Sequence, residues 1–237
     1  MIKPILQIGD PILETVCEDV ALPITPDILE IITDLKDTLA STGELGAGLS
    51  APQIGITKRI AIVKNIDIEM KIRATKSFEA IFRIKLNETT VGDILKSDKT
   101  SIYLKYKDEK FSNADQRNEI VSALEKYLEF SLINPVVEYE NEYETFYWEG
   151  CLSVGVGDDA LYAPVARSEI VRLTYVDLNG ASQKMEAKDY FAHVVLHEID
   201  HLNGKLFLSR VKDITKIWKS KALDVYYKEN GKYPPFE

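Results

Sequence analysis

Residues 197–201 read His-Glu-Ile-Asp-His, and this stretch predicts a helix that carries a hydrolytic metal site. Side chains four positions apart lie on the same face of an α-helix, so His197 and His201 can reach one divalent ion while Glu198 points to its open side. Two histidines also fall at this spacing by chance on some amphipathic helices. The chain holds only three histidines, however, and this pentapeptide uses two of them, which favours the metal site.

A cysteine upstream supplies the ligand that the two histidines lack. A hydrolytic metal site needs three protein ligands and a fourth position at which a bound water becomes acidic. Cys151, within Glu-Gly-Cys-Leu-Ser at 149–153, completes this count with His197 and His201. Taken alone, Cys151 would more often be an inert buried thiol. Iron(II), zinc and nickel all accept such a ligand set, so the residue types leave the metal open.

Amide hydrolysis also needs a proton carrier and donors for the oxyanion. Glu198 is held beside the ligands by its helix, so it can take a proton from the attacking water and pass it to the leaving amine. Gln53 is the natural side-chain donor to the tetrahedral oxyanion because its amide is uncharged, and the backbone N–H of Leu152 is a second candidate. The alternatives are an ordinary exposed helix glutamate and a surface glutamine.

Composition limits the class of protein and its partners. The chain has 237 residues, 45% hydrophobic and 28% charged, so it can bury a substantial core. Its net charge of −9 argues against general binding to nucleic acid, specific DNA binding included, or to an anionic membrane. Two cysteines do not make a disulfide framework, and no apolar run is long enough to span a bilayer. We expect a small or peptidic substrate and a cytoplasmic location.

Periodicity and turn residues predict a mixed chain of helices and strands. A helix is expected from Pro26 until Gly43, followed by a glycine-rich loop, which by itself is more often a turn than a site. Asn179-Gly180 is a strong hairpin turn. The remaining expected elements are strands at 59–63, 132–137, 138–148, 170–176 and 182–186 and helices at 118–128 and 188–202.

Three motifs in this order resemble the signatures of the peptide deformylase (polypeptide deformylase) family. They are Gly-Ala-Gly-Leu-Ser-Ala-Pro-Gln at 46–53, Glu-Gly-Cys-Leu-Ser at 149–153, and the pentapeptide at 197–201. The resemblance spans both ends of the chain and mainly excludes 66–130. We therefore expect a single metallohydrolase domain over residues 1–237, with a long insertion at about 66–130 and a C-terminal helix and tail at about 208–237.

The resemblance implies an α+β fold in which antiparallel sheets surround a central helix that carries the two histidines. It implies hydrolysis of the N-formyl group from the formylmethionine of newly made polypeptides, with release of formate. The metal is usually Fe(II), and zinc, nickel or cobalt can occupy the site. By motif position, the metal ligands are Cys151, His197 and His201, the catalytic groups are Glu198, Gln53 and Leu152, and Gly48 and Gly150 offer backbone hydrogen bonds to the peptide.

Some positions depart from the family pattern. His193 replaces an apolar residue or arginine that the family typically has beside the pocket for the methionine side chain. Leu196 replaces the glutamine that often precedes the first ligand, and Tyr147 precedes the second motif near the same pocket. We therefore expect a side-chain preference that differs from standard formylmethionine. His193 is most simply a pocket-wall or core histidine, since a fourth protein ligand would overfill the metal site. The insertion could cover the cleft or mediate dimerisation, and a neutral loop expansion is the default.

The C-terminal segment and the alternatives in function complete the expectations. Residues 212–232 are locally rich in lysine, which is typical of a solvated helix face; the resemblance suggests contact with the ribosome.

A metallopeptidase shares the histidine motif, but the cysteine ligand and Gln53 argue against it. A related deformylase could act on another formylated amine. A non-catalytic, metal-binding or ribosome-associated homologue is the alternative from a different class.

Overall fold

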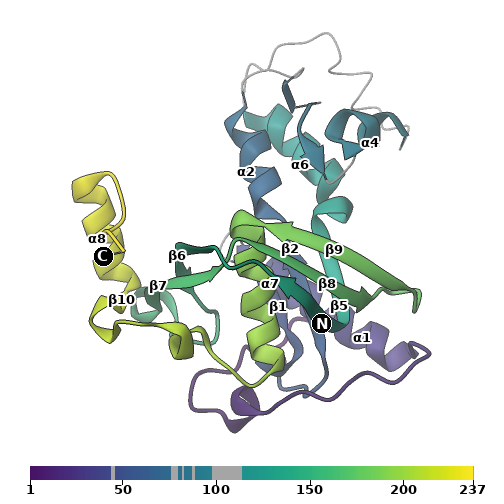
Figure 1. The fold of residues 1–237 in the computed structure, drawn as a ribbon, viewed down its shortest axis with the longest axis horizontal. Helices are drawn as coiled ribbons and strands as arrows, with labels where there is room; N and C mark the ends of the chain where they lie inside the picture. Colours follow the sequence, from purple (N-terminus) through teal and green to yellow (C-terminus); the bar gives the residue numbers. More distant parts are fainter. Residues whose placement is uncertain (44–45, 76–79, 82, 87–88, 98–113, 237) are drawn as a thin grey trace. The chain divides into compact units, whose positions relative to one another are not determined.

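The computed structural model describes residues 1–43, 46–75, 80–81, 83–86, 89–97 and 114–236 (Figure 1). The chain divides into two compact units, which are described separately. The main unit consists of Met1–Val63 with Ser131–Glu237, and the inserted unit consists of Lys64–Phe130.

Two antiparallel sheets form the framework of the main unit. The five-stranded sheet has the order β1-β2-β5-β8-β9, and the three-stranded sheet has the order β10-β7-β6. Their strands are β1 Gly48–Ser50, β2 Ile60–Lys64, β5 Glu129–Glu140, β6 Glu144–Gly150, β7 Leu161–Ser168, β8 Ile170–Val176, β9 Ser182–Lys188 and β10 Trp218–Lys219. The predicted hairpin joins β8 to β9, where Gly180 has φ +78° and its N–H donates to the Asp177 carbonyl.

Helix α7, Asp189–Leu202, carries the histidine motif and lies between the two sheets (Figure 1). It contacts β1, β8 and β9 of one sheet and β6 and β7 of the other. The helix ends where expected, because Gly204 adopts φ +68° and a Cβ there would lie 2.5 Å from the Glu14 carbonyl oxygen. Burial of α7 by both sheets confirms the predicted α+β fold around a central helix.

Helix α1, Pro26–Ser41, covers the five-stranded sheet through one apolar face. Its side chains at helical spacing pack with Leu49, Ile60 and Ile62 of the strands. Each fully buried Leu or Ile contributes about 1.5–3 kcal/mol to folding. The buried apolar residues of the helix are Ile28, Ile32, Leu35 and Leu39. Short 3-10 helices and one further helix complete the unit: η1 Pro11–Glu14, η3 Ala51–Ile54, η4 Gly157–Asp159, η5 Phe207–Arg210, η6 Ile214–Lys216 and α8 Ser220–Asn230.

The inserted unit has a hydrophobic core of its own. Its described elements are α2 Ile66–Ala74, β3 Lys85–Leu86, β4 Thr89–Thr90, α4 Val91–Ser97 and α6 Ala114–Leu128. The core residues are Ile68, Ile72, Ile81, Val91, Ile94, Leu95, Ile120, Val121, Leu124 and Leu128. Where the chain enters and leaves the unit, the Asn65 N–H donates to the Leu128 carbonyl, with N and O 2.7 Å apart. Across the described part of the chain, no helix combines the length and apolar character that a bilayer crossing requires.

Candidate active site

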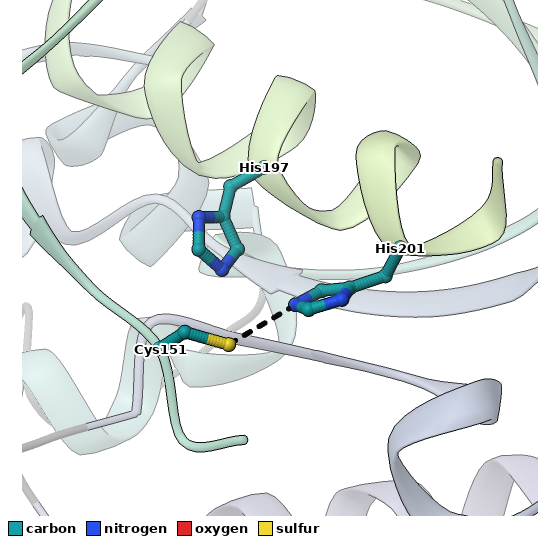
Figure 2. Close-up of side chains that lie close together, drawn as sticks. All are labelled: Cys151, His197 and His201. Atoms are coloured by element: carbon teal, nitrogen blue, oxygen red, sulfur yellow. Dashed lines mark hydrogen bonds between the residues drawn. The ribbon is translucent and has the colours of Figure 1, made fainter. Parts of the chain in front are cut away.

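The three predicted ligands converge from two elements. His197 and His201 lie one turn apart on α7, and Cys151 follows directly after the last residue of β6. Figure 2 shows both imidazoles directed at the thiol. One ligand atom from each residue can be chosen so that all three lie within 4.8 Å of one another, and Cys151 Sγ is 3.2 Å from His201 Nε2. The structure therefore brings together the residues that the sequence proposed as ligands.

The donor set fits a divalent transition metal. One thiol sulfur and two imidazole nitrogens suit iron, zinc, nickel and cobalt. His197 Nδ1 is 3.1 Å from Glu149 Oε2, an interaction that leaves its Nε2 for a metal. Burial lowers the pKa of His201 well below its ordinary value, so the ring is neutral, as a ligand must be.

Glu198 is a buried carboxyl group at the edge of this cluster. It is 3% exposed, and among the described residues its Oε2 has no hydrogen-bond partner. Burial raises the pKa of Glu198 to about 7, which suits a group that takes up and returns a proton near neutral pH. Gly48 makes room for it, since a Cβ at this position would lie 2.5 Å from Glu198 Oε1.

Gln53 presents its amide nitrogen to the thiol side of the site. In a capping box at η3, Gln53 Oε1 accepts hydrogen bonds from the Ser50 N–H at 2.8 Å and the Ser50 hydroxyl at 2.9 Å. Nε2 then lies 3.2 Å from Ser153 Oγ and 3.7 Å from Cys151 Sγ. Because the oxygen is already bonded, the end of the side chain that faces Cys151 is the donor.

A cavity of about 720 Å³ opens beside these groups. Residues from β1, β6, α7 and the loop after Cys151 line it, so both sheets contribute to its wall. Seven of the predicted site residues are part of this lining: Gly48, Gln53, Gly150, Cys151, Leu152, His197 and Glu198. His201 is 1% exposed and is not part of the lining.

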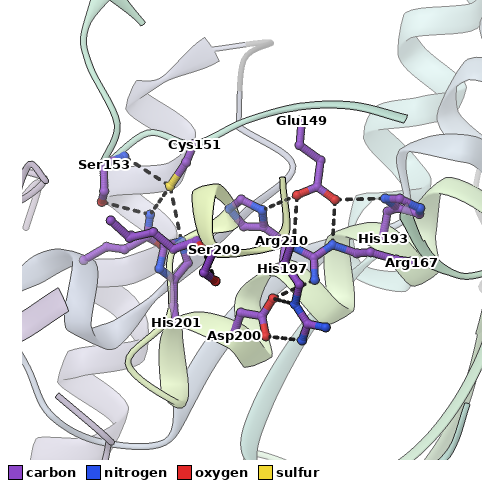
Figure 3. Close-up of polar contacts among 12 residues, drawn as sticks. Glu149, Cys151, Ser153, Arg167, His193, His197, Asp200, His201, Ser209 and Arg210 are labelled. Carbon is purple, nitrogen blue, oxygen red and sulfur yellow. Dashed lines mark hydrogen bonds and ion pairs between the residues drawn. The ribbon is translucent and has the colours of Figure 1, made fainter. Parts of the chain in front are cut away.

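A buried charge network that the sequence prediction missed supports the ligands (Figure 3). Glu149 accepts hydrogen bonds from Arg167 at 2.6 and 3.0 Å and bonds His193 and His197 at 2.9 and 3.1 Å. Burial alone would raise the pKa of Glu149, but these hydrogen bonds hold it well below the ordinary value. The available signal was the position of Glu149, a carboxylate two residues before the proposed ligand Cys151.

The network continues behind α7 through a second carboxylate. Arg167 Nη1 donates to Asp200 Oδ2 at 2.7 Å, and Arg210 donates to both oxygens of Asp200 at 2.7 and 3.0 Å. Asp200 lies inside the histidine motif, yet the sequence prediction gave it no role. Its side chain is 4% exposed, so the motif helix is tied to β7 by charges that are almost fully buried.

The predicted side-chain preference rests on His193, Leu196 and Tyr147, and these three residues lie in different places. His193 lines the cavity, but Leu196 and Tyr147 are not part of its lining. The Tyr147 ring instead packs edge-on against His193, with ring centroids 4.6 Å apart. His193 also stands outside the ligand cluster found among the described residues. Of the three, only His193 is placed to influence a bound molecule directly.

Comparison with known proteins identifies the family. The model of the polypeptide deformylase family matches residues 2–87 and 95–217. The chain belongs to the peptide deformylase family. It is 29% identical over 221 residues to a peptide deformylase of Roseiflexus sp. (strain RS-1), covering 91% of this chain and 92% of the relative. It is 30% identical over 223 residues to peptide deformylase 1 of Bordetella pertussis (strain Tohama I), covering 94% and 95%.

Solved structures of deformylases share the fold. The peptide deformylase of Thermotoga maritima matches with a TM-score of 0.57 at 21% identity, covering 90% of this chain and 99% of that protein. A Met-Ala-Ser-bound class I type b peptide deformylase from Acinetobacter baumannii matches with a TM-score of 0.58 at 21% identity, covering 89% and 99%. Membership of the family makes this deformylase a hydrolase of N-terminal processing, which removes N-formyl groups from new polypeptides.

Proposed function

We propose that this deformylase acts on N-terminal formylmethionine in the cytoplasm, with one Fe(II) held by Cys151, His197 and His201. Zinc, nickel and cobalt are compatible with the same donors. The observation that carries the proposal is the convergence of the three ligand atoms within 4.8 Å beside Glu198, whose Oε2 is buried without a partner among the described residues. These groups meet at a cavity large enough for the start of a peptide chain.

Glu198 is the proton carrier in this proposal. The bound metal supplies Lewis acidity, which makes water a nucleophile near neutral pH. Glu198 accepts the proton that the water loses as its oxygen bonds to the formyl carbon. It then returns this proton to the amine as the C–N bond breaks, so that formate and a free amino terminus leave the site.

Backbone and side-chain donors stabilise the reacting group and the peptide. Gln53 Nε2 and the backbone N–H of Leu152 are proposed to bind the oxyanion of the tetrahedral intermediate. Gly48 and Gly150 line the cavity from β1 and β6, where their backbone groups can bond an extended peptide. A larger residue at either position would collide with Glu198 or with the Tyr162 ring.

The structure changes the physical basis of the expected side-chain preference. Both nitrogens of His193 are engaged by protein acceptors, Glu149 Oε1 and the Thr145 carbonyl, each at 2.9 Å. No ring nitrogen is therefore left to bind a polar substrate side chain. We now expect formyl-Met peptides to be preferred over matched formyl-Gln peptides, and comparable kcat/KM values for the two would contradict this.

Ribosome contact through the C-terminal segment remains a proposal. Its lysines form exposed ion pairs, with Lys219 Nζ 2.7 Å from Asp159 and Lys221 Nζ 3.2 Å from Asp158. Such pairs are worth about 0–1 kcal/mol, so a phosphate-rich partner can displace them. Loss of co-sedimentation with ribosomes at modest salt, or in a Lys216→Gln and Lys219→Gln double variant, is the expected result. Co-sedimentation that survives both changes would exclude this contact.

For the inserted unit, we propose that it is a neutral expansion of the chain without a role in the reaction.

The direct test is formate release from formyl-Met-Ala-Ser by anaerobically purified, Fe(II)-loaded protein. Glu198→Gln is the matched control, since it keeps the shape of the side chain and removes the proton carrier. Formate release that the variant loses supports the proposal. A fully metal-loaded protein that releases no formate from this peptide would contradict it and favour another formylated amine.

A further inference from the structure

His193 occupies a position that the proposed mechanism does not use. It lies one turn before His197 on α7 and is 1% exposed. Its Nδ1 is 2.9 Å from Glu149 Oε1, and its Nε2 is 2.9 Å from the Thr145 carbonyl oxygen. Both partners are acceptors, so the ring is fixed at each end between α7 and β6. The edge-on contact with Tyr147 restricts its plane further.

Glu149 connects this ring to a metal ligand. One carboxylate oxygen bonds His193 Nδ1 and the other bonds His197 Nδ1, while Arg167 donates one hydrogen bond to each. The carboxylate is therefore oriented by donors on both of its oxygens. Loss of His193 would leave Oε1 with Arg167 alone among the described residues, and the carboxylate could then rotate about its last side-chain bond.

We propose that His193 is a positioning residue of the metal site, which acts through Glu149 to fix the imidazole of His197. This inference rests on the proposed role of His197 as a ligand. A carboxylate that accepts from the distal nitrogen of a ligand imidazole sets both its tautomer and its plane. His193 extends this support by one further residue, so that two histidines on the same face of α7 share a single carboxylate.

Other roles for His193 fit the contacts less well. A direct ligand role conflicts with its position outside the ligand cluster of the described residues. A hydrogen bond to substrate conflicts with the engagement of both ring nitrogens. A role in packing alone would not require two hydrogen bonds to acceptors on another element.

The test compares His193→Leu with His193→Asn in the full-length protein. Leucine fills space but donates no hydrogen bond, whereas an asparagine amide can donate from near the position of Nδ1. Thr145→Val is the control: it removes the Thr145 hydroxyl, which lies 3.5 Å from His193 Nε2, and keeps the backbone carbonyl at 2.9 Å. The readouts are the visible spectrum of the Co(II)-loaded protein, which reports ligand geometry, and the metal affinity from chelator competition.

We expect His193→Leu to shift the Co(II) bands and to weaken metal binding by about 10- to 100-fold. His193→Asn should recover part of both, and Thr145→Val should resemble the unmodified protein. A folded His193→Leu protein with an unchanged spectrum and affinity would overturn the inference. If the unmodified protein itself bound no metal, the proposed function would fail instead, so the two failures are distinguishable. If His193→Leu does not fold, His193→Gln takes its place, and an unchanged metal affinity in that variant would overturn the inference.

Discussion

Glu149 is a buried carboxylate that holds three basic side chains in place. Its two oxygens meet Arg167, His193 and His197, and its side chain is only 5% exposed. A buried charge of this kind is stabilised only by its partners, so removing one member leaves the others without compensation. The same carboxylate therefore stabilises the unit and orients His197, a proposed metal ligand.

Glu149→Gln should destabilise the protein by about 3 kcal/mol. The new amide nitrogen would face N–H donors of Arg167, His193 or His197, and the guanidinium would lose half of its charge compensation. The free energy of unfolding from urea titration of metal-free protein measures the effect. Glu144→Gln is the control, because its pair with Lys212 is exposed and is worth less than about 1 kcal/mol. Equal stability of the two variants would refute the prediction.

Gly48→Ala should abolish most formate release while leaving the fold intact. The added Cβ would lie 2.5 Å from Oε1 and 2.8 Å from Cγ of Glu198, so the carboxyl group must move from its place beside the ligands. Steady-state kinetics and a thermal melt together test this. Gly180→Ala, in the hairpin turn, is the control. Its Cβ meets nothing within 4 Å, so turnover should be kept, whereas the φ of +78° strains an alanine and should lower the stability. Unaltered kcat in Gly48→Ala would contradict the argument.

Cys17 should resist alkylation in the native protein. Burial raises the pKa of its thiol from 9.0 to about 11, and only the thiolate reacts. The labelling rate should therefore rise about tenfold per pH unit up to that pKa. Because the folded pKa is the higher one, the free energy of unfolding should fall as the pH rises from 9.0 to about 11. Iodoacetamide labelling followed by mass spectrometry measures the rate, and urea-unfolded protein is the reference; equal rates in both states would disprove protection.

At the scale of elements, regular patterns were predictable and irregular ones were not. The spacing of apolar residues predicted α1 and α7 well, because their buried faces repeat with the helical period. The strand predicted at 132–137 instead runs as β5 through Glu140. Strand β5 continues across a register shift at Asn134, which adopts φ 49°. The Asn134 side chain accepts a hydrogen bond from the Val20 N–H and donates one to the Val20 carbonyl. No local pattern indicates a partner that lies 114 residues away.

The C-terminal elements show the same limit. The lysines of 212–232 favoured a solvated helix face or a charged partner, whereas the structure also shows aromatic contacts between the tail and β6. Trp148 Nε1 donates to the Pro234 carbonyl at 3.2 Å, and the rings of Phe146 and Phe236 stack with centroids 5.7 Å apart. β10 extends the same sheet by pairing Trp218 with Tyr162. Contacts between residues so distant in sequence have no periodicity from which to predict them.

Deleting residues 232–237 should shift the tryptophan emission to longer wavelength. The chain has two tryptophans, Trp148 and Trp218, whose rings lie 6.4 Å apart, and the tail covers Trp148. Removal of the tail exposes that ring to water. Lys232→Gln in the full-length chain is the control and should leave the emission unchanged. An unshifted spectrum after deletion would show that the tail does not shield Trp148 in solution.

At the scale of the molecule, the extent of the motif resemblance indicated which part of the chain departs from the family. The compact inserted unit begins at Lys64 and ends at Phe130, close to the stretch of 66–130 that the motif resemblance excluded. The ten buried apolar residues that form the core of its described part could not be foreseen, since short apolar runs do not reveal which of them pack together. The sequence therefore indicated the bounds of this segment but not the compact packing inside it.

Replacing residues 66–127 with a short glycine-containing linker should leave an active deformylase. The Asn65 N–H and the Leu128 carbonyl are already hydrogen-bonded, so a few residues suffice to join them. The proposed ligands and Glu198 all belong to the main unit. Formate release within about tenfold of the full-length rate is expected, because loop closure changes little with length. A folded, metal-loaded protein without activity would show that the inserted unit takes part in the reaction.

The long sequence distance between the ligands affects how the enzyme matures. Cys151 and His201 are 50 residues apart, so translation at about 5–20 residues per second separates their synthesis by about 3–10 s. Throughout that interval the thiol lacks the imidazoles that later surround it. No amino-terminal fragment ending before residue 201 can hold the complete set of proposed ligands, so we expect metal to be acquired late. We therefore expect the yield of active enzyme to fall when Cys151 is oxidised before the histidines emerge.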